Sequence, residues 1–153
     1  MPRPKIFFFP LFFLCLTVFG QDPPLLELPN FEFPDGKNLQ DYAEKGLVLV
    51  YGDSSCPACQ QAQGQLMLRY RQWQAWGYPI VYIAMDSDKK NVDQNFGTPP
   101  WALYCDEKSW DSPWVEAADI RGTPTLLVLD KNLKTYFRAK NVAQMDIWLR
   151  TQT

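Results

Sequence analysis

Histidine is absent from this chain of 153 residues, and cysteine occurs only four times. Without histidine, the chain lacks the commonest metal ligand and the commonest general base. A zinc site needs about four ligands, and only three of the cysteines lie beyond the first 20 residues, so we expect no metal. The 15 Lys and Arg residues are outnumbered by 17 Asp and Glu residues, and no basic patch stands out. Nucleic acid is therefore not an expected partner.

The first 20 residues have the pattern of a secretory signal peptide. Arg3 and Lys5 precede an almost wholly apolar run over 6–19, and a cleavage point can be placed before Gln21. The run is shorter than the roughly 20 residues that span a bilayer, so we favour cleavage over the alternative of a membrane anchor. The bulky side chain before Cys15 argues against a lipoprotein site.

We therefore predict a signal peptide at 1–20 and one domain at 21–153. The remaining length allows one domain with a proper core and not two. The predicted location is the periplasm, where an oxidising environment lets a disulfide persist.

The hydrophobic pattern alternates between strands and helices. Apolar runs typical of buried strands cover 47–51 and 78–85, and they flank a predicted helix at 60–76. This order predicts a right-handed crossover between parallel strands. The other expected elements are a short strand around 31–33, a turn at 35–36, one or two helical turns in 38–45, a polar loop at 87–100, an extended piece at 101–106, a helix at 112–120, a hairpin of 126–129 with 135–138, and a final helix capped by Asn141.

Two cysteines separated by two residues, Cys56 and Cys59, lie at the predicted start of the long helix. The free N–H groups and positive dipole end of that helix favour the thiolate of the first cysteine, which is the form that attacks disulfides. A structural disulfide is the alternative, although closing so small a loop constrains the unfolded chain little. We predict a redox dithiol, with Pro57 and Ala58 forming the active-site loop between the two sulfurs.

The order of elements resembles the thioredoxin fold over nearly the whole mature chain, with Gly122-Thr123-Pro124 placed before the hairpin. The stretch 28–37 and Lys45-Gly46 are similar to the lead-in of the TlpA/ResA group of exported thioredoxin-like proteins, which includes the reductases of cytochrome c maturation. The resemblance implies an α/β fold: a central mixed β-sheet flanked by helices, with the CxxC motif at the N-terminus of the first main helix.

The resemblance also implies roles for individual residues. Cys56 becomes the exposed nucleophile and Cys59 the more buried resolving thiol. Thr123 is expected to face the sulfurs and to offer backbone hydrogen bonds to a substrate strand. A cis peptide bond is expected before Pro124, whereas an ordinary trans turn is the default for a proline.

Several supporting residues of the group are missing. A tryptophan before the first cysteine is replaced by Ser55, an aromatic residue by Gly52, and the buried acid of thioredoxin by Val50. The glutamate and proline that follow the second cysteine are replaced by Ala62 and Gly64. No buried carboxylate is therefore expected to take the proton of Cys59. Asp53 is the nearest acid in sequence, and turn geometry is expected to point it to solvent.

The third mature cysteine, Cys105, is expected to pack as a small hydrophobic residue, with a second redox thiol or an intermolecular link as alternatives. The tryptophans are expected to be mostly core, although Trp101, Trp110 and Trp114 are candidates for lining a substrate groove. Peroxiredoxins share the fold, but 51–56 lacks the proline that precedes their peroxidatic cysteine.

The sequence thus predicts an exported, periplasmic thiol–disulfide oxidoreductase, with a reductase preferred. The alternatives are a disulfide isomerase or oxidase serving a secretion or conjugation apparatus, and a non-catalytic thioredoxin-like binding module. The expected partners are protein thiols or disulfides and a membrane or periplasmic thiol redox partner. No cofactor is expected, and the protein is predicted to be a monomer.

Overall fold

A five-stranded sheet forms the centre of the protein. The computed structural model describes residues 26–153, so the predicted signal peptide lies outside the described residues. The strands are β1 (Gly46–Gly52), β2 (Ile80–Ala84), β3 (Ala102–Tyr104), β4 (Thr125–Asp130) and β5 (Thr135–Ala139), in the spatial order β3-β2-β1-β4-β5. Strands β1, β2 and β3 run parallel, whereas β4 and β5 pair antiparallel. The predicted mixed sheet is therefore confirmed.

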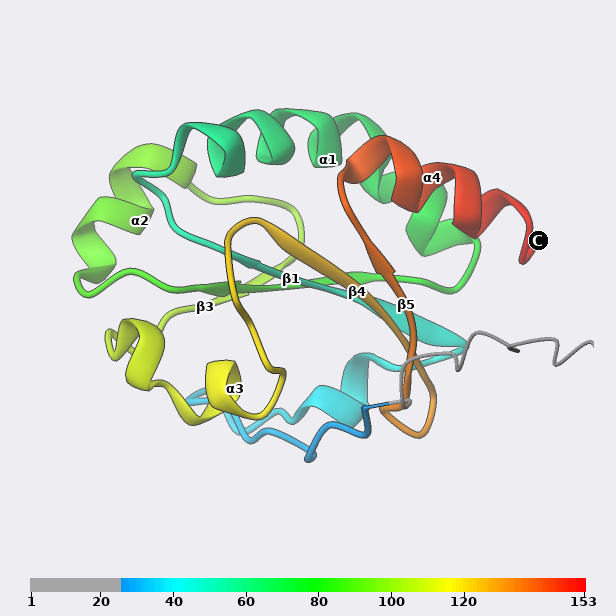
Figure 1. Ribbon diagram of the computed structural model, residues 1–153, viewed down its shortest axis with the longest axis horizontal. Helices are drawn as coiled ribbons and strands as arrows, with labels where there is room; N and C mark the ends of the chain where they lie inside the picture. Colours follow the sequence, from blue (N-terminus) through cyan, green and yellow to red (C-terminus); the bar gives the residue numbers. More distant parts are fainter. Residues whose placement is uncertain (1–25) are drawn as a thin grey trace, which may run out of the picture.

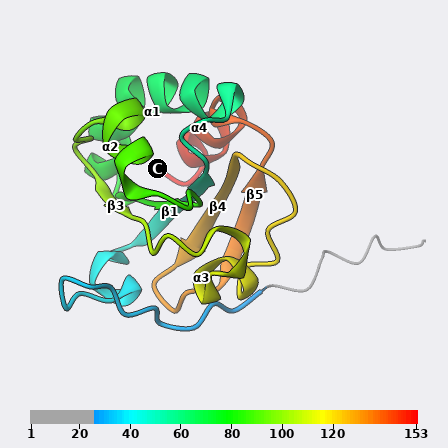
Figure 2. The ribbon, with the colours of Figure 1, turned by 90° about the vertical axis from the view of Figure 1, so that its left-hand side faces the viewer.

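Helices cover both faces of this sheet (Figure 1). On one face lie α1 (Pro57–Ala75), α2 (Lys89–Phe96) and α4 (Val142–Arg150). The other face carries α3 (Pro113–Glu116), the 3₁₀ turns Leu39–Tyr42 and Ser109–Asp111, and the N-terminal segment that leads into β1 (Figure 2). Two separate hydrophobic clusters fill the two faces. Every residue of β1, β2 and β4 is buried, because these strands are covered on both sides.

Local sequence explains where α1 begins and ends. Cys56 is its N-cap residue, and Pro57 occupies the first helical position, where no intrahelical N–H bond is lost. The predicted apolar stripe is present, with Leu66 and Trp73 fully buried. Gly77 follows the helix with a φ of +88°, a conformation that favours glycine. The helix thus starts three residues earlier than predicted and ends close to the predicted point.

The prediction of a polar loop over 87–100 is wrong, because α2 lies within it. The Asp88 side chain caps this helix by accepting a hydrogen bond of 2.8 Å from the backbone N–H of Lys90. Only Val92 and Phe96, one turn apart, are buried, and Gly97 ends the helix with positive φ. A helix this short and this polar carries too few apolar residues to show a period.

The helix predicted over 112–120 is shorter than expected. Ser112 caps it as predicted, accepting from the backbone N–H of Trp114, but α3 ends at Glu116. Turns follow, and Asp119 adopts a φ of 47°, outside helical geometry. The hairpin and the final helix form as predicted, and the side chain of Asn141 accepts from the backbone N–H of Gln144.

The predicted strand around Phe31 and Phe33 is only an isolated bridge between Glu32 and Asn38, although both aromatic rings are buried.

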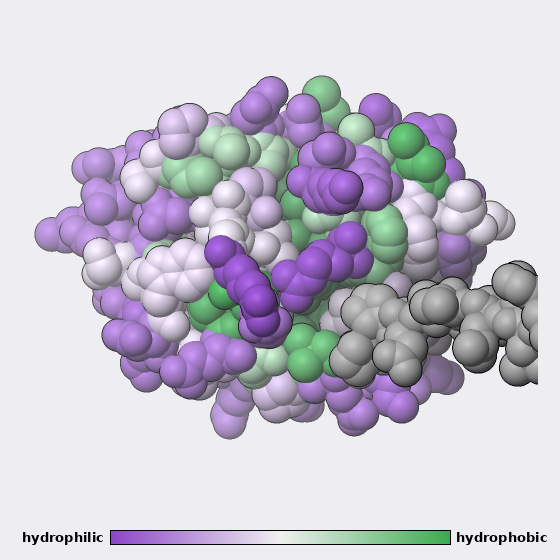
Figure 3. Space-filling view, viewed as in Figure 1, coloured by the Kyte–Doolittle hydropathy of each residue, from purple (hydrophilic) through white to green (hydrophobic). Residues whose placement is uncertain are grey.

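On the face seen in Figure 3, hydrophilic residues dominate, with separate apolar patches over α1 and α4. Within 26–153, none of the helices combines the length and the apolarity that crossing a membrane requires.

Candidate active site

The CxxC pair lies where β1 leads into α1. The strand ends at Gly52, a turn covers 53–55, and Cys56 then caps the helix. The sulfur of Cys56 accepts a hydrogen bond of 3.3 Å from the backbone N–H of Cys59. Cys56 is half-buried, whereas Cys59 is fully buried beneath it. The second sulfur is thus the more buried of the two, in the order that the resemblance implied.

The two thiols differ in acidity. Burial opposes ionisation of Cys56, but hydrogen bonds from the thiol and backbone N–H of Cys59 outweigh it, helped by Thr123 and Ala58, and the pKa of Cys56 is lowered. Burial, together with the neighbouring Cys56, raises the pKa of Cys59 to about 12. At neutral pH the first thiol is therefore the more readily ionised of the two, and the second holds its proton.

The loop before β4 places Thr123 beside the first cysteine. The sulfur of Cys56 lies 4.0 Å from the carbonyl oxygen of Thr123, within the range of a weak sulfur hydrogen bond. The peptide bond between Thr123 and Pro124 is cis. The hydroxyl of Thr125 donates to the carbonyl oxygen of Gly122 over 2.7 Å, which closes the turn around the proline. Residues 67 positions apart in the chain thus meet at one sulfur.

A buried carboxylate, which the sequence analysis did not identify, supports the turn that carries Cys56. Asp86 follows β2 and is 3% exposed. It accepts a hydrogen bond of 3.0 Å from the backbone N–H of Ser54 and a second from the Ser54 hydroxyl. Burial raises the pKa of Asp86, although the bonds from Ser54 oppose the rise. Sequence could have suggested this contact, because the carboxyl ends of parallel neighbours β1 and β2 share one edge of the sheet.

Asp53, the acid nearest the pair in sequence, has a local role. One of its carboxylate oxygens accepts from the backbone N–H of Ser55 over 2.8 Å, and its carbonyl oxygen accepts from the backbone N–H of Cys56 over 3.1 Å. Both bonds belong to the turn itself. Asp53 therefore shapes the approach to Cys56.

A thioredoxin-like domain model matches residues 29–152 of the sequence. The chain belongs to the thioredoxin-like family. No curated protein is significantly similar in sequence.

Solved structures share this thioredoxin-like fold. A thiol-disulfide oxidoreductase from Bacteroides fragilis superposes with a TM-score of 0.70 at 18% identity, covering 83% of this chain and 99% of the other. The thioredoxin domain of a Bacteroides vulgatus thiol-disulfide oxidoreductase gives 0.67 at 16% identity, over 84% and 94%. A thiol:disulfide interchange protein from a Bacteroides species gives 0.64 at 16% identity, over 83% and 86%. Identities this low show a common fold.

The third cysteine of this thioredoxin-like domain stands apart from the pair. Cys105 follows β3, is half-buried, and packs against the core cluster that contains Cys59. Its thiol lies 3.5 Å from the carbonyl oxygen of Asp86, and burial raises its pKa. These surroundings fit the small hydrophobic residue that the sequence favoured.

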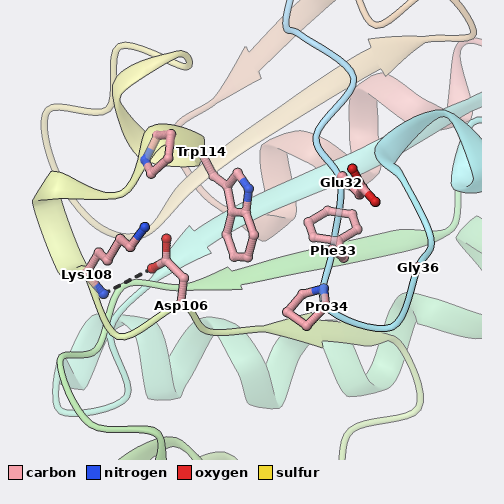
Figure 4. Close-up of a pocket in the computed structure, with 8 residues that line it drawn as sticks. Glu32, Phe33, Pro34, Gly36, Asp106, Lys108 and Trp114 are labelled. Atoms are coloured by element: carbon pink, nitrogen blue, oxygen red, sulfur yellow. Dashed lines mark hydrogen bonds between the residues drawn. The ribbon is translucent and has the colours of Figure 1, made fainter.

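The three tryptophans proposed for a substrate groove do not come together. Trp101 packs in the cluster under α1, Trp114 packs in the cluster on the opposite face of the sheet, and Trp110 is 51% exposed. Trp114 instead lines a cavity of about 480 Å³ between α3 and the N-terminal segment, opposite Phe33 (Figure 4). That cavity includes neither cysteine of the pair. Closeness to Pro124 in the sequence was therefore a wrong basis for placing the three tryptophans together in a substrate groove.

Within residues 26–153, no group of three or more His, Cys, Asp or Glu side chains is placed to hold a metal ion.

Proposed function

We propose that this thioredoxin-like protein is an exported thiol–disulfide oxidoreductase that reduces protein disulfides through Cys56 and Cys59. The observation that carries the proposal is the difference between the two thiols. Cys56 is accessible at a helix N-terminus with a lowered pKa, whereas Cys59 is enclosed with a pKa raised to about 12. A nucleophile that ionises first and a partner that waits protonated are what a two-step exchange requires.

The proposed reaction begins when the Cys56 thiolate attacks one sulfur of a substrate disulfide. A Cys56–substrate disulfide forms, and the other substrate sulfur leaves with the electron pair and takes up a proton. Cys59 then loses its proton and attacks the sulfur of Cys56, which releases the second substrate thiolate. The substrate gains two electrons and two protons, and the protein pair becomes a disulfide. A membrane or periplasmic thiol partner is needed to reduce the pair again.

Thr123, with Pro124 beside it, is the proposed docking point for the substrate chain. Its carbonyl oxygen lies 4.0 Å from the attacking sulfur, so an extended substrate segment paired with this backbone would lie against Cys56. Pro57 and Ala58 add no charge to the loop between the cysteines. Recognition in this proposal is therefore carried by the backbone and is permissive about the substrate's sequence.

Insulin reduction by residues 21–153 in the presence of dithiothreitol tests the activity. We expect the wild-type domain to accelerate precipitation of the insulin B chain, the Cys56→Ser variant to lose that acceleration, and the Cys105→Ser variant to retain it. The proposal would be contradicted if wild type and Cys56→Ser are equally inactive and the disulfide between Cys56 and Cys59 resists mild reductant. That result would favour the non-catalytic binding module.

A redox titration of the pair tests the direction. A reductase is expected near the thioredoxin end of the range, at about −270 mV, whereas an oxidase lies nearer about −120 mV. A potential at the oxidising end of this range would favour an oxidase or isomerase over the proposed reductase.

Export rests on the pattern at 1–20 and is tested in a bacterial host. We expect the protein in the periplasmic fraction with Gln21 as its N-terminus. Recovery in the membrane fraction with residues 1–20 still attached would instead support the anchored alternative. Gel filtration of the purified domain is expected to give a monomer.

A further inference from the structure

The phenol oxygen of Tyr82 is buried without a hydrogen-bond partner. The side chain extends from β2 into the same core cluster as Cys59, and Tyr82 is fully buried. Among the described residues, nothing is placed to bond its hydroxyl. Because burying an unpaired hydroxyl costs free energy, such a group in a native core calls for an explanation.

The hydroxyl lies beside the resolving cysteine. A Cβ atom built on Gly52 would overlap the phenol oxygen of Tyr82 and would lie 3.3 Å from the sulfur of Cys59. The oxygen and the sulfur therefore lie beside the same point of β1, and the phenol fits there only because residue 52 has no side chain. Position 52 is where the sequence has glycine in place of an aromatic residue, and the phenol oxygen of Tyr82 from the neighbouring strand lies there instead.

The register of the sheet explains how the ring reaches this point. Tyr82 pairs with Val50, the position at which no acid is present. Phe96 of α2 contacts the ring edge-to-face, with centroids 5.4 Å apart, and so fixes its orientation. A phenol thus occupies the region beside Val50 that would otherwise be wholly apolar.

Building on the proposed disulfide exchange, we propose that the hydroxyl of Tyr82 donates a hydrogen bond to the sulfur of Cys59 when that sulfur ionises to attack Cys56. The phenol oxygen and the sulfur both lie beside residue 52, so the donor is close to the sulfur before the step begins. Hydrogen bonds to charged partners are stronger than those between neutral groups, and the thiolate therefore gains more than the thiol.

Tyr82 acts in this step as a donor and not as a base. Burial raises its pKa far above the ordinary value, and the charges of Cys59, Asp86, Cys56 and Asp53 raise it further, so the phenol keeps its proton. The proton of Cys59 ends on the leaving substrate thiolate. The Cys59–Cys56 bond forms as the Cys56–substrate bond breaks, and Tyr82 is unchanged at the end.

Reaction with the aromatic disulfide DTNB separates the two steps in one experiment. Attack by Cys56 releases the first coloured thiolate, and resolution by Cys59 releases the second. All variants carry Cys105→Ser, so that no third thiol reacts. Losing the hydrogen bond is expected to raise the pKa of Cys59 by about one unit, which cuts the thiolate fraction about tenfold. The stronger base is about threefold more nucleophilic, so Tyr82→Phe should slow the second phase about threefold.

The first phase serves as an internal reference and is expected to stay within about 1.5-fold of the parent, because Tyr82 does not contact the attacking sulfur. Tyr51→Phe is the matched control. The Tyr51 phenol, on the other face of β1, donates to the carbonyl oxygen of Trp114 over 2.9 Å. Its loss should lower thermal stability and leave both phases unchanged, whereas Tyr82→Phe should not lower thermal stability.

A second phase equal to the parent in Tyr82→Phe, or an equal slowing of both phases, would overturn the inference. Failure of the proposed function looks different. In that case wild-type protein fails to reduce insulin, while the second DTNB phase still depends on Tyr82. If insulin is reduced and Tyr82→Phe leaves the rate of the second phase unchanged, only the inference about Tyr82 is contradicted.

Discussion

The backbone N–H of Ser54 donates a hydrogen bond of 3.0 Å to the buried carboxylate of Asp86. This contact joins the end of β2 to the turn that carries Cys56. Two further side chains hold Ser54: Gln60 donates to its carbonyl oxygen over 2.8 Å, and Asn95 donates to its hydroxyl over 3.3 Å. The position of the first cysteine therefore depends on contacts with the following strand and with α1 and α2.

Replacing Asp86 by alanine should destabilise the fold. The buried N–H of Ser54 would lose its partner, which costs about 1–3 kcal/mol of unfolding free energy. Urea denaturation measures this loss. Asp111→Ala, which removes an exposed carboxylate, is the control and should stay within about 0.5 kcal/mol of wild type. Equal stability of the two variants would show that Asp86 does not hold the turn.

The stability contribution of Asp86 should depend on pH in a defined direction. Because burial raises the pKa of Asp86, the folded state binds the proton more tightly than the unfolded state does. The part of the stability that comes from this pKa difference is therefore present below the unfolded-state pKa of about 3.9 and is lost as pH rises through the folded-state value. As the pH rises through this range, wild type should lose stability relative to Asp86→Asn. Urea midpoints of both proteins at several pH values measure the difference. A stability difference that instead grows in favour of wild type as the pH rises would contradict this prediction.

Alkylation of Cys56 by iodoacetamide should reach half its maximal rate at a pH below that of an ordinary cysteine. The thiol of Cys59 contributes a hydrogen bond to the Cys56 thiolate, so Cys59→Ala should move this midpoint upward. Cys59→Ser keeps a donor and should move it less. The rates are measured by mass spectrometry in a Cys105→Ser background. Identical midpoints in the alanine and serine variants would show that the backbone N–H alone lowers the pKa of Cys56.

Asp146 should contribute to the packing of α4 on α1. Its carboxylate accepts from the indole N–H of buried Trp73 over 2.9 Å and from Arg150 over 3.0 Å. Asp146→Ala leaves the indole unpaired and should cost about 1–3 kcal/mol in urea denaturation. Asp93→Ala, which removes an exposed pair with Lys89, should cost about 0.5 kcal/mol or less.

The effect of Asp146 should fade in acid. Burial raises the pKa of this carboxyl, but Trp73, Arg150 and Arg69 outweigh burial and hold the pKa below its usual value. The stability that it contributes is present above the unfolded-state pKa and is lost as pH falls through the folded-state value. The difference between wild type and Asp146→Ala should therefore shrink toward low pH, and a constant difference would contradict this assignment.

Gly52→Ala should destabilise the protein through Tyr82. The added Cβ would overlap the phenol oxygen but would lie 3.0 Å from the ring carbon that bears it. The cost should therefore be smaller in a Tyr82→Phe background, and a double-mutant cycle in urea measures the coupling. Gly64→Ala is the control, because nothing lies within 4 Å of its Cβ in the helix, and it should stabilise by about 1 kcal/mol. If the free-energy costs of Gly52→Ala and Tyr82→Phe are simply additive, the two residues do not interact, and the prediction is wrong.

Local signals in the sequence were enough to predict the elements around the cysteines. A continuous apolar run, two cysteines followed by a helical stripe ending at Gly77, and the Asn141 cap each act through residues a few positions apart. The helix α2 was missed because its apolar contribution is only Val92 and Phe96. The groove of tryptophans was misplaced because adjacency in sequence does not say which face of the sheet a side chain joins.

The sequence by itself determined the strand–CxxC–helix unit, the hairpin and the order of elements, because these follow from hydrophobic period and capping chemistry within short segments. Only the tertiary structure decided which groups surround the sulfurs. The pairing of β1 with β2 places Tyr82 beside Val50 and Asp86 beneath Ser54, and the loop before β4 brings Thr123 to Cys56. Burial, and with it the acidity of each thiol, is a property of neighbours that are far apart in the chain.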